Sequence, residues 1–423
     1  MLLLNDILND KEAIIKALNK KHFDATEILD RIIEIDKQRR SAKAELDNVL
    51  SESNKLSKEI GLLFKQGKRE EAEEIKKRTT FLKNKSKELN DTFTESQEEI
   101  DKLLLEIPNI PAEIVPEGKS DEDNEIVFES ENNVKLEDWA LPHWDLANKY
   151  NIIDFELGNK VTGSGFPFYK GLGAKMQRAL INFFLNTAVE NGFTEYQPPL
   201  MVNEDSGYGT GQLPDKEGQM YHISLDNLYL IPTAEVPITN IFRDTIVSKE
   251  DLPIKCVAYS QCFRREAGSY GKDVRGLNRL HQFDKVEIVE ISNQEDSYEV
   301  LDSMVKYVES LIKKLELPYR ILRLCGGDLS FTSALTYDFE VYSAAQKRWL
   351  EVSSVSNFVS YQANRLKLRY KDEKGKSVLC HTLNGSALAL PRIMAALLEN
   401  NQTQEGILIP KVLQPFMGTD IIK

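Results

Sequence analysis

The chain has 423 residues, 41% of them hydrophobic and 9% aromatic, and a formal net charge of −13 at pH 7. One hydrophobic core rarely serves a chain of this length, so we expect two or three domains of a soluble globular protein rather than a disordered chain. No apolar run approaches ~18 residues and no cleavage site follows the first apolar patch, so neither a transmembrane helix nor a secretory signal is expected.

The spacing of cysteine and histidine argues against a disulfide framework and a zinc site. The four cysteines (Cys256, Cys262, Cys325 and Cys380) are scattered and lack the close pairs of a zinc ribbon. The five histidines form no HExxH pattern, and the chain has neither a P-loop nor a GxGxxG stretch. We therefore expect reduced thiols in a cytoplasmic protein, without a zinc-hydrolase, Walker-type or Rossmann site.

The first quarter of the chain carries a heptad pattern, in which residues recur at alternating steps of three and four. The first series is Ile28, Ile32, Ile35, Arg39, Ala42, Leu46, Val49, Ser53, Leu56, Ile60 and Leu63. The second series is Ala72, Ile75, Thr79, Leu82, Ser86, Leu89, Phe93, Ser96, Ile100, Leu103 and Ile107. This spacing forms one stripe along a helix, and Gly67 marks a turn, so we predict an antiparallel two-helix coiled coil within residues 1–107. Helices of about 35 residues would span roughly 50 Å.

The predicted coiled coil is basic although the chain is acidic. Residues 37–87 contain 15 Lys and Arg against 8 Asp and Glu, a local charge of +7. Mixed charge is routine on the solvated face of a coiled coil, and that interpretation needs no function. The alternative is an arm that contacts a phosphate backbone, which requires a large partner.

The rest of the chain is predicted to form a linker and a domain that contains both helices and strands. Residues 108–124 contain Pro108, Pro111, Pro116 and Gly118 before an acidic run, which indicates a linker. Beyond it we expect helices at 175–192 and 296–317, and strands at 254–259, 283–291, 319–324, 337–342 and 349–355. Several of these strands follow one another closely, which favours an α+β domain with a mostly antiparallel sheet flanked by helices.

The stretch 261–287 gathers charges of both signs. It contains Arg264, Arg265, Lys272, Arg275, Arg279 and Lys285 among Glu266, Asp273, Asp284 and Glu287. We expect a strand–loop–strand hairpin with Arg264 at its edge, because the Arg fork binds phosphate through two parallel hydrogen bonds. Glu266 would face the same ligand if both residues lay on a strand, and it could accept from an exocyclic amine. A surface ladder of ion pairs is the alternative.

Three further stretches contain residues suited to a nucleotide or an amino acid. In 350–357, Glu351 precedes two serines, and a carboxylate beside a hydroxyl suits a magnesium ion that bridges phosphates. In 382–400 we expect a strand, a turn at Gly385-Ser386 and a helix whose Arg392 could lie over a base. In 231–238, Thr233 and Glu235 could face an ammonium group. Each stretch alone also fits an ordinary strand or helix start.

The order of these stretches resembles class II aminoacyl-tRNA synthetases. The helix that ends at Gly192, with Pro199 after it, resembles their motif 1. Residues 263–266 resemble motif 2, and residues 385–392 resemble motif 3. "TAE", "FRRE", "RGLNRLHQFDKVE", "EVSSVSN" and "LNGSALALPR", behind an N-terminal coiled coil, are together similar to the seryl-tRNA synthetase family over essentially the whole chain. The resemblance implies a ligase that forms seryl-adenylate from L-serine and ATP and transfers serine to tRNA(Ser), with tRNA(Sec) open as a second acceptor.

The same resemblance implies the roles of individual residues. The catalytic residues would be Arg264, Arg392 and Glu351, with Mg2+ on Glu351 and Ser354. ATP would contact Arg264, Arg265, Glu266, Leu280, His281, Gln282, Phe283, Glu351, Val352, Ser353, Ser354 and Arg392. Serine would contact Thr233, Ala234, Glu235, Arg264, Glu287, Asn384 and Ser386. Adenine would lie between Phe283 and Arg392, with its amine on Glu266.

The resemblance also implies partners and a division into domains. The basic arm would grip tRNA(Ser), and the chain would form a homodimer through the motif 1 region, without a membrane partner. Residues 1–107 would be the tRNA-binding domain, 108–124 the linker and 125–423 the catalytic domain. Two rivals remain: a ligase that loads a carrier protein, whose members lack the long arm, and a non-catalytic coiled-coil protein that binds RNA.

Overall fold

The computed structural model describes residues 1–131, 134–266 and 275–423. Their contacts divide the chain into two compact units, one of residues 2–19 and 23–108, the other of Met1, 20–22 and 109–423. Of the charged cluster at 261–287, Lys272 and Asp273 lie outside the described residues. Across the described ranges, we find no helix that combines the length and the apolar character needed to cross a membrane.

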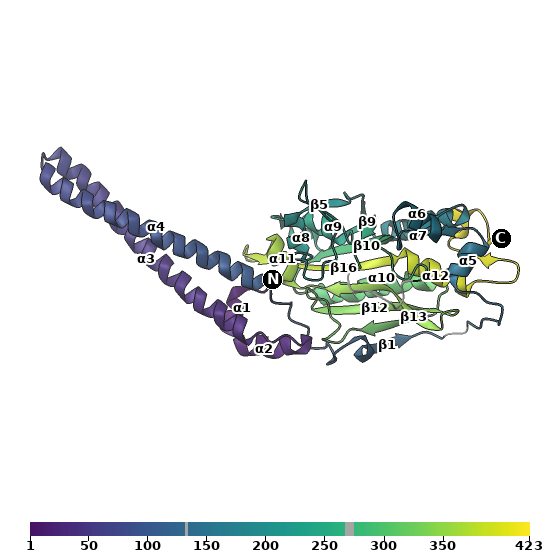
Figure 1. The fold of residues 1–423 in the computed structure, drawn as a ribbon. Helices are drawn as coiled ribbons and strands as arrows, with labels where there is room; N and C mark the ends of the chain where they lie inside the picture. The colour runs from purple at the N-terminus through teal and green to yellow at the C-terminus, as the bar shows by residue number, and fades with distance from the viewer. Residues whose placement is uncertain (132–133, 267–274) are drawn as a thin grey trace. The chain divides into compact units, whose positions relative to one another are not determined.

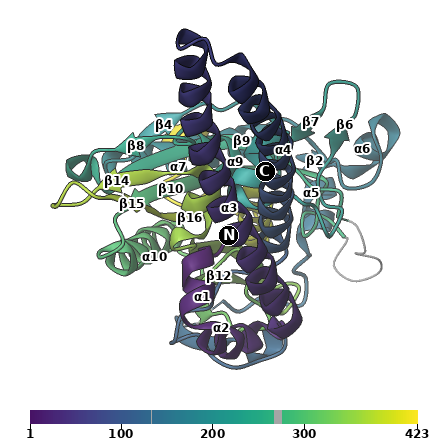
Figure 2. The same ribbon diagram turned by 90° about the vertical axis from the view of Figure 1, so that its left-hand side faces the viewer.

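The first unit is built on two long antiparallel helices, as the heptads predict. Its helices are α1 Leu4–Asn9, α2 Lys11–Leu18, α3 Thr26–Lys65 and α4 Arg69–Leu105. Figures 1 and 2 show α3 and α4 side by side along their length. With 40 and 37 residues they are longer than expected and span roughly 55–60 Å at ~1.5 Å per residue. Gly67, at φ +76°, makes the turn between them, because a side chain would be strained there.

The heptad positions of α3 and α4 form the contact between the two helices. All residues of both series are buried or partly buried, and Ile32 and Leu82 are at most 2% exposed. Arg39 lies in this seam because it donates to Asp36 Oδ1 at 2.7 Å and to Gln97 Oε1 at 3.0 Å. Asp36, on the same helix, is 1% exposed, and the bond to Gln97 joins the two helices, so this polar contact favours one register.

The second unit contains a large sheet, which has eight strands in the described residues. In spatial order they are β1 Glu125–Glu129, β11 Tyr319–Arg323, β12 Leu335–Ser343, β13 Arg348–Asn357, β16 His381–Ala389, β10 Gln282–Ser292, β9 Ile254–Phe263 and β4 Thr194–Tyr196. Neighbours are antiparallel except β4 and β9, which are parallel. The predicted mostly antiparallel sheet is confirmed, and all five predicted strands form, with ends that differ by at most four residues.

Helices cover both faces of this sheet. α7 Leu172–Glu190, α10 Ser297–Lys314 and α12 Leu390–Asn400 pack on one face, where the main hydrophobic core lies. α10 buries Val300, Met304, Val308 and Leu311, the stripe of an amphipathic helix. α9 Glu235–Asn240 and α11 Ser360–Leu366 lie on the other face, since residues of alternate parity along β9 and β10 enter a second, smaller core with them.

Shorter elements complete the second unit. The remaining helices are α5 His143–Lys149, α6 Phe155–Val161, α8 Glu204–Thr210 and α13 Gln414–Met417. The remaining strands are β2 Ile153–Asp154, β3 Phe168–Tyr169, β5 Met201–Asn203, β6 His222–Ile223, β7 Leu228–Leu230, β8 Ile246–Val247, β14 Arg369–Lys371, β15 Ser377–Leu379, β17 Ile407–Leu408 and β18 Ile421–Ile422. These strands form small sheets apart from the large one.

One predicted turn is wrong. Gly385 and Ser386 do not end a strand but lie inside β16, where they pair with Ile288 and Glu287 of β10. The lack of a side chain at Gly385 has a different use, because a Cβ there would lie 3.0 Å from Val355 on the neighbouring strand. The helix expected after the turn begins at Leu390, directly after the strand.

Candidate active site

Strand β10 presents a row of functional side chains on the face that carries α9 and α11. Because successive side chains of a strand point to opposite faces, Phe283, Lys285 and Glu287 share one face. Asp284 points to the other face, toward α7, where Gln177 Nε2 donates to it at 2.7 Å. The charged cluster of the sequence is therefore divided by the sheet, and only part of it belongs to the candidate site.

Glu287 is a buried carboxyl that two neighbours hold in place. It is 3% exposed, and Lys285 Nζ lies 2.7 Å from its Oε2. Ser386 Oγ donates to the same oxygen at 3.4 Å. A bulge between β10 and β16 sets the register that brings Ser386 opposite Glu287. The predicted pocket residues Glu287 and Ser386 are thus in contact.

Glu235, the first residue of α9, is a second buried carboxyl. Gln362 Nε2 donates to its Oε1 at 2.7 Å, and its own backbone N–H donates to Thr233 Oγ1 at 3.2 Å. Burial and the charge of Glu287 raise the pKa of Glu235 to about 7, although hydrogen bonds from Gln362 and Asn384 oppose this rise. At neutral pH this carboxyl therefore gains or loses its proton easily.

Arg264 lies just beyond the end of β9, against an aromatic surface. Its guanidinium carbon is 5.3 Å from the centre of the Phe283 ring. The backbone N–H of Arg264 donates to His281 O at 2.9 Å. His281 is itself fixed, since its Nδ1 lies 3.1 Å from Tyr221 Oη and its ring stacks on Phe166 with centroids 5.4 Å apart. The cation of Arg264 beside the Phe283 ring suits a ligand that carries both phosphate and a base.

Arg392, near the start of α12, reaches back to two other segments. Its Nε donates to Asn278 O at 3.1 Å, and its Nη1 donates to Glu351 O at 2.7 Å. The same Nη1 lies 3.4 Å from Glu351 Oε2. The Arg392 side chain is still 32% exposed, so one edge of the guanidinium is fixed while the rest is open to a ligand.

Glu351 and Ser354 are three residues apart on β13 and yet face the same side. In a regular strand, positions three apart face opposite sides. The pairing of β13 with β12 slips by one residue at Val352, and this bulge restores the alignment. As a result Ser354 Oγ lies 3.5 Å from Glu351 Oε1.

The oxygen atoms beside this bulge fit a magnesium ion. Asp338 on β12 pairs with Ser354, and its buried Oδ1 has no hydrogen-bond partner. Burial, and then the charge of Glu351, holds the pKa of Asp338 well above its ordinary value. Mg2+ takes few protein oxygens and keeps waters and phosphates as its other ligands. Within the described residues no group of three or more His, Cys, Asp and Glu side chains forms a metal site.

The remaining predicted residues surround these groups in different ways. Val352 and Leu280 are part of the main core, and Ala234 is part of the smaller one. Ser353 Oγ donates to a backbone oxygen of β16 at 2.6 Å. Gln282 begins β10. Of these residues, only Gln282 and Ser353 carry polar side-chain atoms.

The expected strand geometry of Arg264 and Glu266 is wrong. β9 ends one residue before Arg264, and Glu266 has φ +51°, so strand alternation does not place them. Glu266 forms an ion pair with Arg279. Arg265 is exposed, and its backbone N–H donates to Gln219 O at 2.8 Å. In this structure the carboxylate of Glu266 is thus engaged by an arginine of the same stretch.

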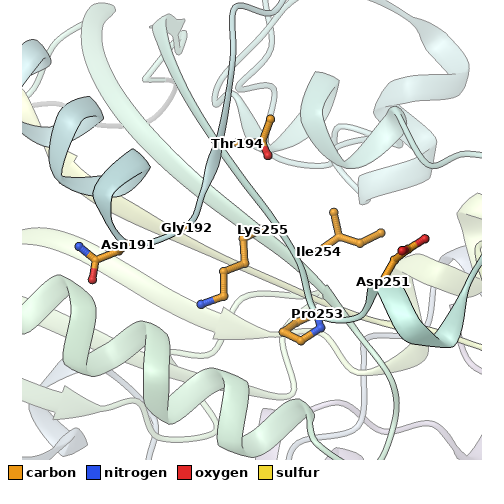
Figure 3. Close-up of a pocket in the computed structure, with 7 residues that line it drawn as sticks. All are labelled: Asn191, Gly192, Thr194, Asp251, Pro253, Ile254 and Lys255. Carbon is orange, nitrogen blue, oxygen red and sulfur yellow. The ribbon is translucent and has the colours of Figure 1, made fainter.

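An open pocket of about 680 Å³ lies elsewhere on the second unit, near the starts of β4 and β9. Figure 3 shows its lining residues, Asn191, Gly192, Thr194, Asp251, Pro253, Ile254 and Lys255. None of the predicted site residues borders it. We therefore place the candidate site at β10, β13 and β16 and not in this pocket.

Comparison with known proteins covers both units. The family described as "tRNA synthetase class II core domain (G, H, P, S and T)" matches residues 221–401, and "Seryl-tRNA synthetase N-terminal domain" matches residues 1–111. A serine–tRNA ligase of Salinibacter ruber is 51% identical over 420 residues, which cover 99% of this chain and 98% of that protein. The chain belongs to the seryl-tRNA synthetase family.

Other members of the seryl-tRNA synthetase family match over the full length as well. A serine–tRNA ligase of Akkermansia muciniphila is 45% identical over 425 residues, covering 100% of this chain and 99% of that protein. The crystal structure of seryl-tRNA synthetase from Pyrococcus horikoshii, complexed with ATP, has a TM-score of 0.92 at 33% identity and covers 100% of this chain and 99% of that one. The predicted family and fold class are confirmed, and the carrier-protein alternative is not supported.

The structure adds residues to this seryl-tRNA synthetase site that sequence reasoning did not assign. Lys285 contacts Glu287 and could have been found, because it lies two positions earlier on a predicted strand. Gln362, Asn278 and Asp338 gave no such signal. Gln362 and Asp338 come from other segments, which the packing of α11 and β12 brings to the site, and Asn278, although it lies in the stretch 261–287, meets Arg392 only because α12 packs beside it.

Proposed function

We propose that this chain activates L-serine with ATP and transfers the serine to tRNA(Ser). One arrangement carries the proposal: two buried carboxyl groups interact, Glu287 on β10 opposite Ser386 of β16 and Glu235 at the start of α9, and Arg264 and Arg392 follow the ends of β9 and β16 in the chain. A small pocket with acidic groups fits a small amino acid with an ammonium group. The exposed edges of two arginines fit phosphate oxygens.

The two carboxyl groups of the pocket have different tasks. Glu287 is fixed through Oε2 by Lys285 and Ser386, so its other oxygen is a directional acceptor for the hydroxyl of serine. Glu235, near Thr233 and with a pKa of about 7, receives the serine ammonium, which favours its ionised form. Asn384 completes the pocket beside Glu235.

The first step joins the two substrates. An oxygen of the serine carboxylate attacks the α-phosphorus of ATP, the bond to the bridging oxygen of the β-phosphate breaks, and pyrophosphate leaves with the electron pair. No side-chain nucleophile takes part. Arg264 binds the α-phosphate and the serine carboxylate, so it brings two anions together and stabilises the charge of the transition state. Arg392 stabilises the same charge from the side opposite Arg264.

The nucleotide lies over β10 and β13. Adenine stacks on Phe283, which Arg264 covers in this structure, so Arg264 turns toward the phosphate when the base enters. Arg392 covers the second face of the base, and Glu266 accepts from its amine. Glu351 and Ser354 would hold Mg2+, which supplies positive charge to the phosphates when bound.

The second step uses the arm. The terminal ribose hydroxyl of tRNA(Ser) attacks the carbonyl carbon of seryl-adenylate, the ester forms, and AMP leaves. We propose residues 1–107 as the tRNA-binding domain, 108–124 as the linker and 125–423 as the catalytic domain. Duplex RNA is bound through shape and backbone, which a long basic arm suits. A homodimer through the motif 1 region and tRNA(Sec) as a second acceptor are part of this proposal.

Pyrophosphate exchange with each of the standard amino acids tests the proposal, followed by charging of tRNA(Ser). We expect exchange with serine and charging of tRNA(Ser). Exchange with another amino acid alone would refute serine as the substrate. Absence of any exchange from a folded, tRNA-binding protein would favour the non-catalytic rival.

A further inference from the structure

A buried hydrogen-bonded pair, His143 and Glu399, lies behind the candidate site, between α5 and α12. His143 and Glu399 are both 0% exposed, and His143 Nδ1 lies 2.7 Å from Glu399 Oε1. Glu399 also accepts from the backbone N–H of His143 at 3.0 Å, from Gln346 Nε2 at 3.0 Å and from the Ser343 hydroxyl. Burial opposes its ionisation, but the bonds from His143 and Ser343 outweigh this effect and lower the pKa of Glu399.

The hydrogen bonds of His143 fix its tautomer. Its second ring nitrogen, Nε2, faces the backbone N–H of Leu277 at 2.9 Å. A backbone N–H can only donate, so Nε2 carries no proton and Nδ1–H donates to Glu399. His143 therefore acts as a bridge that ties Leu277 to a carboxylate of α12.

The segment held in this way leads to Arg392. Leu277 is followed by Asn278, whose carbonyl oxygen accepts from Arg392 Nε at 3.1 Å. The side chain of Asn278 is also held, since its Nδ2 donates to Gln346 Oε1 at 2.9 Å. Gln346 in turn donates to Glu399. Helix α12 thus holds residues 277–278 through two contacts. Arg392 binds Asn278 directly, and Glu399, seven residues further along, binds Leu277 through His143.

Helix α5 holds the residues just before this segment as well. The guanidinium carbon of Arg275 lies 4.6 Å from the centre of the Trp144 ring. A Cβ added at Gly276 would lie 2.1 Å from His143 Nε2, and Gly276 has φ +69°, so only glycine fits here. The contacts from α5 therefore fix residues 275–277.

We propose that His143 and Glu399 are positioning residues for ATP activation, because they hold Leu277 and Asn278 in the place from which Asn278 orients Arg392. Neither side chain touches a substrate, since both are fully buried. This inference rests on the proposed function, in which Arg392 binds the nucleotide. A misplaced guanidinium weakens catalysis even when the fold is intact, because phosphoryl-transfer chemistry depends on position.

A matched pair of variants separates the two hydrogen bonds of His143. His143→Asn keeps a donor toward Glu399 but has no acceptor that reaches Leu277. His143→Gln has a longer amide, whose oxygen can accept from the Leu277 N–H. We expect His143→Asn to raise the KM for ATP in pyrophosphate exchange by about tenfold with the KM for serine within about twofold, and His143→Gln to restore most of the loss.

Two further variants control for folding. His381→Asn removes an imidazole away from the site, which is half-buried and whose Nδ1 lies 2.7 Å from Ser297 Oγ, and should lower the Tm without changing the KM for ATP. If His143→Asn does not fold, Gln346→Met tests the same path, because it removes the contact to Asn278 at a partly buried position, and it should again raise the KM for ATP alone.

The two proposals fail in different ways. Equal changes of both KM values, or no change for ATP in the folded variants, would overturn the positioning role. The positioning role would also be overturned if His143→Gln had a KM for ATP as high as that of His143→Asn. Absence of serine-dependent exchange in the unmodified protein would instead refute the proposed function.

Discussion

Lys285 Nζ lies 2.7 Å from Glu287 Oε2, and both side chains are less than a tenth exposed. Removal of one partner of a buried ion pair leaves an uncompensated charge and costs about 3–5 kcal/mol. Truncation of Glu287 would therefore mix a loss of stability with any loss of substrate recognition. The pocket has to be probed with a substitution that keeps the volume of the side chain and an oxygen for Lys285.

Glu287→Gln should narrow the discrimination between serine and alanine. The amide oxygen of the substituted side chain would still bind Lys285, so an NH2 group would face the substrate hydroxyl in place of a carboxylate oxygen. A site built to bind a hydroxyl rejects the analogue without it by ~10⁴-fold or more, and we expect this ratio to fall by at least about tenfold. The measurement is kcat/KM in pyrophosphate exchange with serine and with alanine. Glu290→Gln, a buried acid on the same strand, is the control, and an unchanged ratio would remove Glu287 from the pocket.

Arg264→Ala should lower pyrophosphate exchange by about 10²-fold or more, because it removes a charge that stabilises the transition state. Affinity for tRNA(Ser), measured by filter binding, should stay within about twofold, since the arm is unchanged. A parallel loss of tRNA affinity would indicate misfolding rather than a catalytic role. Exposed Arg265→Ala should have a smaller effect on exchange.

Deletion of residues 30–100 should leave serine activation intact and abolish charging of tRNA(Ser). The cut is compatible with the fold of the hairpin, because Arg31 pairs with Glu99 and Glu52 with Arg78, so residues 29 and 101 face each other and a short Gly–Ser turn can join them. The readouts are pyrophosphate exchange and aminoacylation by the same preparation. Full charging by the shortened protein would refute the role of the arm.

The KM for serine should fall as the pH rises through about 7. Glu235 has a pKa of about 7, so it is protonated and neutral below that pH and ionised above it. Only the ionised form attracts the serine ammonium, which stays charged throughout. Glu235→Gln should raise the KM for serine and make it independent of pH between 6 and 8. A pH-independent KM in the unmodified protein would assign the ammonium to another group.

Glu290→Gln should stabilise the protein above pH 7 and leave it unchanged near pH 4. Burial raises the pKa of Glu290 from 4.5 to about 7, and Lys255 opposes this only in part. Between these values the native state binds more protons than the unfolded state, so the free energy of unfolding falls as the pH rises. We expect a gain of roughly 1–3 kcal/mol at pH 8 in urea denaturation. Equal stability of the unmodified protein and Glu290→Gln at pH 8 would contradict a raised pKa of Glu290.

Patterns that repeat along the chain were predictable. The steps of three and four gave the seam of α3 and α4, because a helix returns to the same face at that spacing. Arg39 is the one charged residue of the two series, and its ion pair with Asp36 shows why it is tolerated in the seam. The strands of the large sheet were also recognisable, although their ends were not.

Local irregularities were not predictable. Strand alternation placed Arg264 and Glu266 on one face, but β9 ends before them. The Gly-Ser pair at 385–386 suggested a turn, yet it lies in a central strand where Gly385 makes room for Val355. Glu351 and Ser354 share a face only because of the bulge at Val352, which depends on the pairing with β12.

The sequence by itself determined the two-helix arm, the α+β class and the order of the motifs, because these depend on neighbours along one helix or one strand. The tertiary structure alone decided which distant groups meet: Gln362 with Glu235, Ser386 with Glu287, and His143 with Glu399 behind Arg392. Such contacts follow from strand order, register and helix packing, and the energy of a buried charge depends on the partner that these bring to it.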